Sequence, residues 1–227
     1  MSTKQYSFGM ALLVWSLLWM GSVMAAPPES SAVPDLKSQG IIAGVNYREL
    51  SEPQPTDAAP GTVEVVEFFW YNCQTCFVIE PALARWLDSQ QGKVTFRRVP
   101  AVVGTHMVYF ARAYYAAEAL GIEDSVHLPI YEALHRYGRA LDREEELAAF
   151  FTEHGVDHKH FLSVFRSSTV AAGVRSAQVL ARTYEIAGAP SFIIAGKYRV
   201  DPTMAANASA LLQTVAALVE QEQRNAR

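Results

Sequence analysis

The most informative stretch of this chain is residues 62–76, Thr-Val-Glu-Val-Val-Glu-Phe-Phe-Trp-Tyr-Asn-Cys-Gln-Thr-Cys. Residues 62–70 are mainly β-branched and aromatic and carry only two charges, which predicts a central strand covered on both faces. A helical pattern follows from Cys73 to about Ser89. The chain therefore passes from a buried strand into a helix at a pair of cysteines.

The segments on either side of this stretch alternate between strand and helix. The pattern predicts strands within residues 41–50, 94–99, 191–195 and 198–200, a helical stretch from 106 to about 185, and a closing helix around 211–219. Within the helical stretch, Asp142 and Asp157 are candidate N-caps. The pattern indicates an α/β sheet interrupted by a helical insertion.

Composition excludes several classes of protein. The chain has 227 residues, of which 50% are hydrophobic and 19% charged, and its formal net charge is −4. The apolar content excludes a disordered chain, and the lack of excess positive charge argues against a nucleic-acid partner. The length fits one large domain, or one domain with a sizeable insertion.

The first 25 residues have the pattern of a secretory signal peptide. Lys4 is followed by an apolar stretch, Met10–Met20, and then by small residues up to Ala25. A stretch of about 11 apolar residues is typical of a signal peptide, whereas a membrane span needs about 20. We therefore expect cleavage after Ala25, a flexible leader over residues 26–40, and a mature protein outside the cytoplasm, where disulfides persist.

Cys73 and Cys76 are the only cysteines, and their spacing suits redox chemistry. At the start of a helix, Cys73 meets free backbone N–H groups and the positive end of the helix dipole. Both favour the thiolate, which is the nucleophilic form of a cysteine. Cys76, one turn further on, is within reach to close a disulfide or to resolve a mixed disulfide.

Two other interpretations of the cysteine pair remain open. A structural disulfide across so short a loop would remove little chain entropy and would stabilise the fold weakly. A metal site would need further ligands, and these would have to be histidines. His154, His158 and His160 form one candidate cluster, although a solvated loop and helix start explain them better.

A second motif, Gly188-Ala-Pro-Ser-Phe-Ile-Ile194, lies more than a hundred residues later. Pro190 enters an apolar strand, where proline is out of place unless it lies at the start of the strand or at a sheet edge. Only about 5% of X–Pro bonds are cis, but this context favours the cis form.

The two motifs together resemble the DsbA family of periplasmic thiol:disulfide oxidoreductases, which have a thioredoxin fold with an inserted helical domain. The matching segments are Val65–Cys76 and Gly188–Tyr198, with the helical stretch between them. The resemblance implies an α/β thioredoxin-like domain formed by residues 41–103 and 186–227, and an all-helical insertion domain formed by residues 104–185.

The resemblance also assigns roles to individual residues. It implies that Cys73 is the exposed nucleophile and Cys76 its buried partner. Pro190 would be the cis-proline facing the disulfide, and Ala189 would offer its backbone to an extended substrate. Glu67 matches the family's buried acid, which would have a raised pKa and could relay the proton of Cys76. The alternative is an acid that reaches solvent at a sheet edge.

Gln74 and Thr75 depart from the family, in which the dipeptide between the cysteines is most often Pro-His. Both residues are expected to contact substrate, and the Thr75 hydroxyl can donate a hydrogen bond to the thiolate, but neither supplies a positive charge. A loss of two pKa units of thiolate stabilisation would make the disulfide less oxidising by roughly 60 mV. Phe96 stands where the family often has a lysine, and its presence is expected to keep Glu67 protonated for longer as the pH rises.

Four neighbouring residues have two interpretations each. Trp70 and Tyr71 suit either an apolar rim for substrates or core packing. Arg97 and Arg98 suit either charges on an edge strand or the steering of a partner. The sequence does not separate these interpretations.

These features predict a periplasmic dithiol oxidase that passes the Cys73–Cys76 disulfide to unfolded exported proteins with free cysteines. No cofactor is expected besides this disulfide, and the family implies a monomer that is reoxidised by a membrane partner of the DsbB type. A periplasmic disulfide reductase remains an alternative, whereas residues 26–62 are too short for the dimerisation domain of a DsbC-type isomerase. A non-catalytic peptide-binding module and a metal chaperone are further alternatives.

Overall fold

The strand predicted at residues 62–70 lies inside a five-stranded sheet. In the computed structural model, which describes residues 35–226, β2 (Val63–Phe69) is buried along its whole length. It pairs in parallel with β3 (Val94–Pro100) and antiparallel with β4 (Ser191–Ile194). The prediction of a central strand is therefore confirmed.

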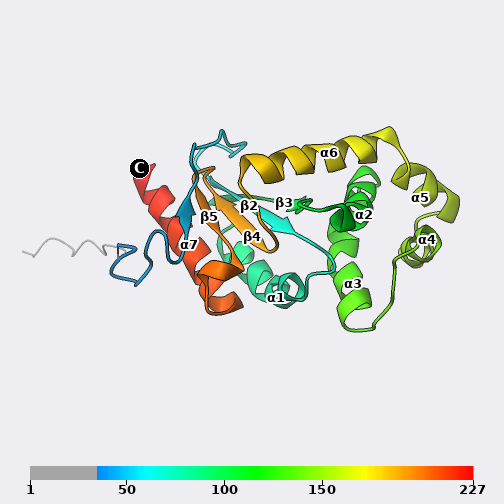
Figure 1. Ribbon diagram of the computed structural model, residues 1–227, viewed down its shortest axis with the longest axis horizontal. Helices are drawn as coiled ribbons and strands as arrows, with labels where there is room; N and C mark the ends of the chain where they lie inside the picture. The colour runs from blue at the N-terminus through cyan, green and yellow to red at the C-terminus, as the bar shows by residue number, and fades with distance from the viewer. Residues whose placement is uncertain (1–34, 227) are drawn as a thin grey trace, which may run out of the picture. The chain divides into compact units, whose positions relative to one another are not determined.

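Two short strands complete the sheet beyond β4. β5 (Tyr198–Val200) pairs antiparallel with β4, and β1 (Arg48–Glu49) pairs antiparallel with β5. The order across the sheet is β1-β5-β4-β2-β3, so β3 is an edge strand (Figure 1).

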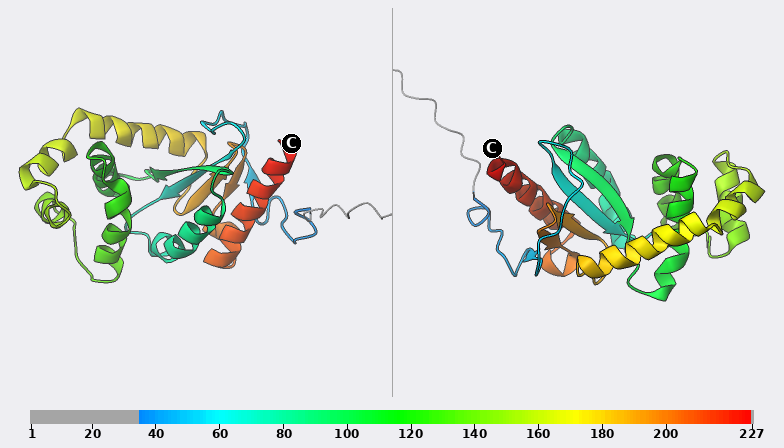
Figure 2. Two further views of the ribbon diagram at one scale, coloured as in Figure 1. Left: turned by 180° about the vertical axis from the view of Figure 1, so that it is seen from behind. Right: turned by 90° about the horizontal axis from the view of Figure 1, so that it is seen from above.

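The alternation of side chains along β2 separates two layers of the core. Val63 and Val65 pack in one cluster with residues of α1 (Gln74–Ser89) and α7 (Ala208–Asn225). Val66 and Phe68 pack in another cluster with residues of α6 (Ser168–Thr183), so helices cover both faces of the sheet (Figure 2). Glu67 has the same parity as Val65 and therefore faces α1.

The helical stretch predicted between β3 and β4 is confirmed. Its elements are a 3₁₀ turn, η1 (Thr105–Met107), followed by α2 (Val108–Ala119), α3 (Glu123–His135), α4 (Glu144–Glu153), α5 (His158–Phe165) and α6. Phe69, Tyr71 and Cys76 lie in one buried cluster with residues of α2 to α5. The helical segment and the start of α1 therefore share a core.

One of the two predicted helix caps is wrong. Asp157 caps α5, because its carboxylate accepts a hydrogen bond of 2.8 Å from the backbone N–H of His160. Asp142 does not cap α4; the N-cap is Arg143, without a side-chain hydrogen bond. The first turn of α4 instead contains Glu144, Glu145 and Glu146, which compensate the helix dipole.

The expected signal peptide, residues 1–25, lies outside the described residues, as does most of the expected leader. Residues 36–40 form turns, and Leu36 is buried in the cluster that contains α1 and α7. Packed structure therefore begins before Ile41, because one leucine within a Pro- and Ser-rich segment finds an apolar partner surface. Within residues 35–226, no helix combines the length and apolar character needed to cross a membrane.

Candidate active site

Cys73 is the N-cap of α1, directly after the loop that leaves β2. Its backbone is extended, with φ −98° and ψ 110°, and its Sγ accepts a hydrogen bond of 3.1 Å from the backbone N–H of Cys76. An N-cap side chain normally satisfies one of the free N–H groups in the first helical turn. Here a thiol does so, and the helix start therefore stabilises negative charge on sulfur.

The two thiols have opposite acidities. Cys73 is partly exposed, and hydrogen bonds from the Cys76 thiol and from the backbone N–H groups of Thr75 and Cys76 outweigh burial and lower its pKa to about 7. Cys76 is fully buried, and burial together with its hydrogen bond to Cys73 raises its pKa far above the ordinary value. At neutral pH, a substantial fraction of Cys73 is therefore thiolate, while Cys76 remains a thiol.

Gln74 and Thr75 are both exposed beside Cys73. Thr75 stabilises the Cys73 thiolate through its backbone N–H, and within residues 35–226 its hydroxyl has no hydrogen-bond partner. The hydrogen bond that the Thr75 hydroxyl could donate is therefore not formed within the described residues, and backbone N–H groups of α1 stabilise the thiolate.

The motif at residues 188–194 lies against the cysteines. The Ala189–Pro190 peptide bond is cis, as expected, and Pro190 directly precedes β4. The Cys73 thiol donates a hydrogen bond of 3.4 Å to the carbonyl oxygen of Ala189. Residues 116 positions apart thus come into contact, because the antiparallel pairing of β2 and β4 places the end of one strand beside the start of the other.

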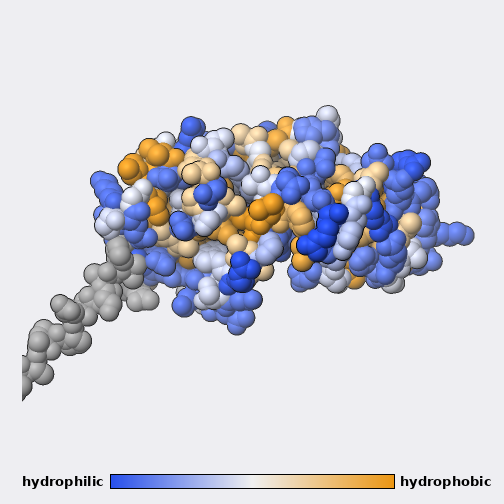
Figure 3. Space-filling view, turned by 90° about the horizontal axis from the view of Figure 1, so that it is seen from below, coloured by the Kyte–Doolittle hydropathy of each residue, from blue (hydrophilic) through white to orange (hydrophobic). Residues whose placement is uncertain are grey.

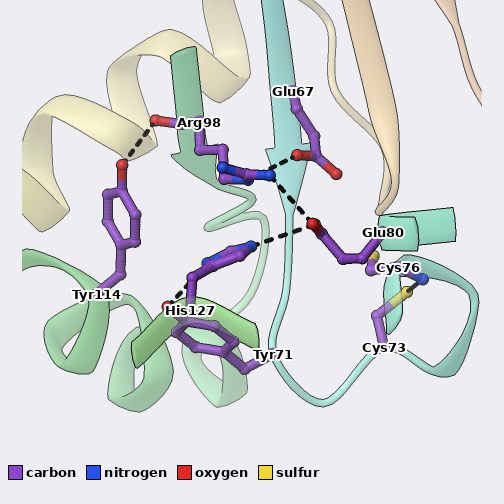
Figure 4. Close-up of polar contacts among 8 residues, drawn as sticks. All are labelled: Glu67, Tyr71, Cys73, Cys76, Glu80, Arg98, Tyr114 and His127. Atoms are coloured by element: carbon purple, nitrogen blue, oxygen red, sulfur yellow. Dashed lines mark hydrogen bonds and ion pairs between the residues drawn. The ribbon is translucent and has the colours of Figure 1, made fainter. Parts of the chain in front are cut away.

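Glu67 is fully buried in the layer that contains α1. Burial and the nearby charge of Glu80 raise its pKa to about 8, despite the guanidinium of Arg98. The Arg98 Nε lies 3.2 Å from one carboxylate oxygen of Glu67, while the other has no partner among the described residues (Figure 4). The alternative of an acid that reaches solvent is therefore wrong.

The raised pKa of Glu67 agrees with the expectation that it stays protonated for longer as the pH rises, although a cation does lie beside it. Phe96 does replace the lysine of the family, but Arg98 is two residues further along the same strand and pairs directly with Glu67 in the β2–β3 register. Residues two apart on a strand share a face, so a longer side chain from position 98 reaches the same carboxylate.

Two further residues near the cysteines, Glu80 and His127, were not identified from the sequence. Glu80, one helical turn after Cys76, accepts hydrogen bonds from Arg98 and from His127 of α3, at 3.0 and 3.2 Å. The other ring nitrogen of His127 lies 3.1 Å from the hydroxyl of Tyr71. The i, i+4 spacing of Cys76 and Glu80 was the available sequence signal, because it places both on one helix face.

The residues with two interpretations can now be assigned. Tyr71 is buried and belongs to the core, whereas Trp70 is partly exposed and packs edge-to-face against the ring of His106. Arg97 forms an ion pair with buried Glu64 on the other face of the sheet. Arg98 bridges Glu67 and Glu80, so the two arginines have internal partners.

The candidate histidine cluster is dispersed. His154 bonds to the carbonyl of Phe150, and His158 forms an ion pair with Glu145. In the described part of the chain, no group of three or more His, Cys, Asp or Glu side chains is arranged to hold a metal ion.

An apolar groove lies between α1 and α7. It has a volume of about 290 Å³ and is lined by Val78, Ile79 and Trp86 of α1 and by Ala208 and Leu212 of α7. Figure 3 shows the face toward α1, where apolar side chains are exposed near the middle of the molecule. Its first lining residue, Val78, is five positions after Cys73 on the same helix.

Comparisons with known proteins agree with this geometry. A family model described as the DSBA-like thioredoxin domain matches residues 90–219. The thiol:disulfide interchange protein DsbA of Azotobacter vinelandii is 38% identical over 187 residues, which cover 82% of this chain and 87% of the relative. The protein of the same name from Pseudomonas aeruginosa is 35% identical over 191 residues, covering 84% and 90%.

Solved structures show the same likeness. The crystal structure of Pseudomonas aeruginosa DsbA superposes with a TM-score of 0.76 at 34% identity, covering 83% of this chain and 98% of that one. The crystal structure of the oxidoreductase DsbA from Xylella fastidiosa gives a TM-score of 0.73 at 31% identity, covering 79% and 96%.

Proposed function

Because this chain belongs to the DsbA family of thiol:disulfide interchange proteins, we propose that Cys73 and Cys76 form its redox-active disulfide and that it oxidises substrate dithiols. The chain is a thiol:disulfide oxidoreductase with a thioredoxin fold and a helical insertion. The observation that carries the assignment of the site is the difference between the two thiols. Cys73 is accessible and acidic, whereas Cys76 is buried and holds its proton.

The reaction starts from the oxidised pair. A substrate thiolate attacks the Sγ of Cys73, forms a mixed disulfide and expels the Cys76 sulfur as a thiolate. Glu67 is protonated below about pH 8 and supplies the proton that the buried Cys76 sulfur needs. A second substrate thiolate attacks the substrate sulfur of the mixed disulfide, and Cys73 leaves as a stabilised thiolate. Two electrons pass from the substrate to the protein.

Substrate binding uses the surface around Cys73. The backbone of Ala189, next to cis-Pro190, is placed to pair with an extended segment, as in β-augmentation. Gln74 and Thr75 flank the reacting sulfur from the exposed side. The apolar groove between α1 and α7 suits the apolar side chains of unfolded proteins, which folded proteins bury.

The cellular setting follows from the sequence and the family. Residues 1–25 act as a cleaved signal peptide, residues 26–40 as a leader, and the mature protein works as a monomer in the periplasm on exported proteins with free cysteines. Members of the family use a redox-active disulfide without an external cofactor, and a DsbB-type membrane partner reoxidises the reduced protein. Residues 41–103 and 186–227 form the thioredoxin-like domain, and residues 104–185 form the helical domain.

The first experiment equilibrates the protein with glutathione buffers and measures the reduced fraction by thiol alkylation. An oxidase keeps the pair reduced in buffers as oxidising as roughly −180 mV, because its thiolate form is stabilised. The Cys73→Ser variant should exchange no disulfide, and Cys76→Ser should accumulate the mixed disulfide with glutathione. A Cys73→Ser variant that still oxidises dithiols would contradict this function.

The same titration separates the alternatives. A pair that stays oxidised down to roughly −250 mV indicates a reductase or a stable structural disulfide, and the exposed Gln74-Thr75 dipeptide, which lacks a positive charge, is the feature that favours this outcome. A peptide-binding module would keep its binding activity when both cysteines are replaced. An oxidase would lose its activity.

A further inference from the structure

His127 connects the helical segment to the carboxylates beneath the cysteines. It lies on α3, is 5% exposed, and has a hydrogen-bond partner at each ring nitrogen. Its Nε2 lies 3.2 Å from Glu80, and its Nδ1 lies 3.1 Å from the hydroxyl of Tyr71. An ionised carboxylate only accepts hydrogen bonds, so Nε2 carries the proton and Nδ1 accepts from Tyr71. The ring orientation is thereby fixed from both sides.

Arg98 is shared between two carboxylates in this layer. Its Nε lies 3.2 Å from Glu67, and its Nη2 lies 3.0 Å from Glu80. Its carbonyl oxygen accepts a hydrogen bond of 3.3 Å from the Tyr114 hydroxyl of α2, which anchors this part of β3 (Figure 4). Glu67 and Glu80 therefore share one guanidinium, and of the two carboxylates only Glu80 is hydrogen-bonded to His127.

We infer that His127 is a positioning residue for the redox reaction. Its hydrogen bond holds Glu80 in place, so that the Arg98 guanidinium is shared between Glu80 and Glu67. Nothing in the family comparison or in the sequence motifs assigns it a role. The inference rests on the proposed function, because it concerns the proton that Glu67 gives to Cys76.

The electrostatic consequence has a definite sign. Hydrogen bonds from His127 and Arg98 overcome burial and lower the pKa of Glu80, so Glu80 is ionised. Its charge raises the pKa of Glu67, whereas Arg98 lowers it. If the His127 hydrogen bond is lost, Glu80 protonates more easily, Arg98 acts mainly on Glu67, and the pKa of Glu67 falls.

Few other charged groups face Glu67. Among the described residues, apart from Glu80, which raises the pKa of Glu67, and Arg98, which lowers it, only the thiolate of Cys73 acts on Glu67, and it raises the pKa. Around His127, burial lowers the pKa, Glu80 and Asp124 raise it, and Arg98 lowers it, so its ring is neutral at neutral pH. A neutral ring donates one hydrogen bond to Glu80, and the sharing of the Arg98 guanidinium between Glu80 and Glu67 depends on this bond.

A cavity connects this cluster to the outside of the sheet edge. Its volume is about 230 Å³, and its lining includes Arg98, Tyr114 and His127, with Glu123 and Asp124 at the start of α3. Within residues 35–226, no residue that lines this cavity also lines the groove between α1 and α7, so the two hollows are separate.

The test measures the titration of Glu67 in the oxidised protein, where neither thiol titrates. The side-chain carboxyl ¹³C signals of glutamate are followed against pH by NMR, and the Glu67 signal is assigned by its loss in Glu67→Gln. In the unsubstituted protein we expect a midpoint well above the ordinary value of a glutamate, because burial and the charge of Glu80 still act on Glu67 when the Cys73 thiolate is absent. In His127→Leu we expect the midpoint to fall by about one pH unit.

Two matched variants separate positioning from general damage. His127→Gln keeps an N–H donor toward Glu80 and should retain most of the original midpoint, whereas His160→Leu, at an exposed histidine of α5, should not change it. If His127→Leu does not fold, Glu80→Gln removes the charge of the same carboxylate and should lower the midpoint at least as much.

The outcomes distinguish this inference from the proposed function. A Glu67 midpoint that is unchanged or raised in folded His127→Leu, or in Glu80→Gln, overturns the role of His127 even if disulfide exchange is normal. A midpoint that falls as expected supports the role of His127. A Cys73→Ser variant that keeps its oxidase activity instead overturns the proposed function, whatever the NMR titration gives.

Discussion

Cys73 and Cys76 are three positions apart, but the pKa of Cys73 is lowered and the pKa of Cys76 is raised. The extended N-cap backbone directs two N–H groups and one S–H group at the Cys73 sulfur, while the first turn of α1 buries the Cys76 sulfur. The same turn therefore makes one thiol a good leaving group and the other a poor one. This difference is the physical basis for the proposal that Cys73 exchanges with substrate.

The acidity of Cys73 should depend on the Cys76 side chain. In reduced Cys76→Ala, the largest contribution to the low pKa of Cys73 is removed, and we expect that pKa to rise by about one to two units. Cys76→Ser keeps a hydroxyl donor and should show a smaller rise. The thiolate absorbance in the ultraviolet, followed against pH, measures both. Equal midpoints near 7 in all three proteins would show that the backbone alone stabilises the thiolate.

Thr75 offers a second test, since only its backbone contacts the thiolate. Thr75→Val should therefore leave the pKa of Cys73 unchanged. Thr75→His adds a positive charge near the sulfur, and each unit by which it lowers that pKa should make the disulfide more oxidising by about 30 mV. The glutathione equilibrium reports the potential. A large effect of the valine variant would mean that the hydroxyl does bond to the sulfur.

Strand and helix ends bring the reacting groups together. β2 ends shortly before Cys73, and β4 begins immediately after Pro190. Because these strands are antiparallel neighbours, with Phe68 opposite Ser191, the end of β2 and the start of β4 lie at the same end of the two strands. The active site is therefore set by strand pairing and by a single helix start.

The closing helix depends on its N-cap. The Asn207 side chain accepts a hydrogen bond of 2.9 Å from the backbone N–H of Ala210 and starts α7, which covers one face of the sheet. Asn207→Ala should lower the free energy of unfolding by about 1 kcal/mol, whereas Asn207→Asp keeps the acceptor and should cost less. Urea denaturation of the two variants measures this difference. Equal losses would show that the side-chain acceptor is not what matters.

Across the molecule, the helical segment supports the redox loop. Tyr71 is buried in the cluster formed by α2 to α5, its carbonyl bonds to His135 of α3 at 2.7 Å, and Phe77 stacks on the same histidine ring. The loop that carries Cys73 is thus held from the helical side as well as from the sheet. The helical segment therefore helps to hold the loop that carries Cys73 in position.

The stability of the whole protein should depend on its redox state and on pH. The folded reduced form stabilises the Cys73 thiolate, whose pKa of about 7 lies below that of an unfolded cysteine. This stabilisation is absent below pH 7 and grows up to the pKa of the unfolded thiol, about 8.5.

The difference in unfolding free energy between the reduced and oxidised proteins should therefore rise from pH 6.5 to 8.5. We expect a rise of about 1 kcal/mol after allowing for screening at a partly exposed group. Denaturation of both forms at the two pH values measures it, and a Cys73→Ser, Cys76→Ser double variant should show no such rise. A difference that falls with pH would contradict the thiolate argument.

Local patterns were sufficient for most of the fold and for part of the site. The apolar run of β2, the helix start at Cys73 and the proline before β4 are recognisable because burial and backbone geometry restrict residue types at neighbouring positions. The same patterns identified Cys73, Cys76 and the unusual position of Pro190, whereas the roles of Glu67 and Ala189 came from the resemblance to the family. The structure places Ala189 in contact with Cys73 and buries Glu67. Asp142 failed as a cap because a helix end can move by one residue with little change in pattern.

The electrostatic surroundings of Glu67 could not be obtained in this way. Arg98 lies beside Glu67, in place of the lysine that the family often has, only because β2 and β3 pair in one particular register. Glu80 and His127 meet only because α1 packs on α3. Coulomb and hydrogen-bond energies depend on distances of a few ångströms between elements, whereas hydrophobic patterns depend on spacing along one element. Local sequence motifs therefore determine the class of chemistry, thiol–disulfide exchange. The protonation of Glu67 depends instead on how segments that are distant in the sequence pack together.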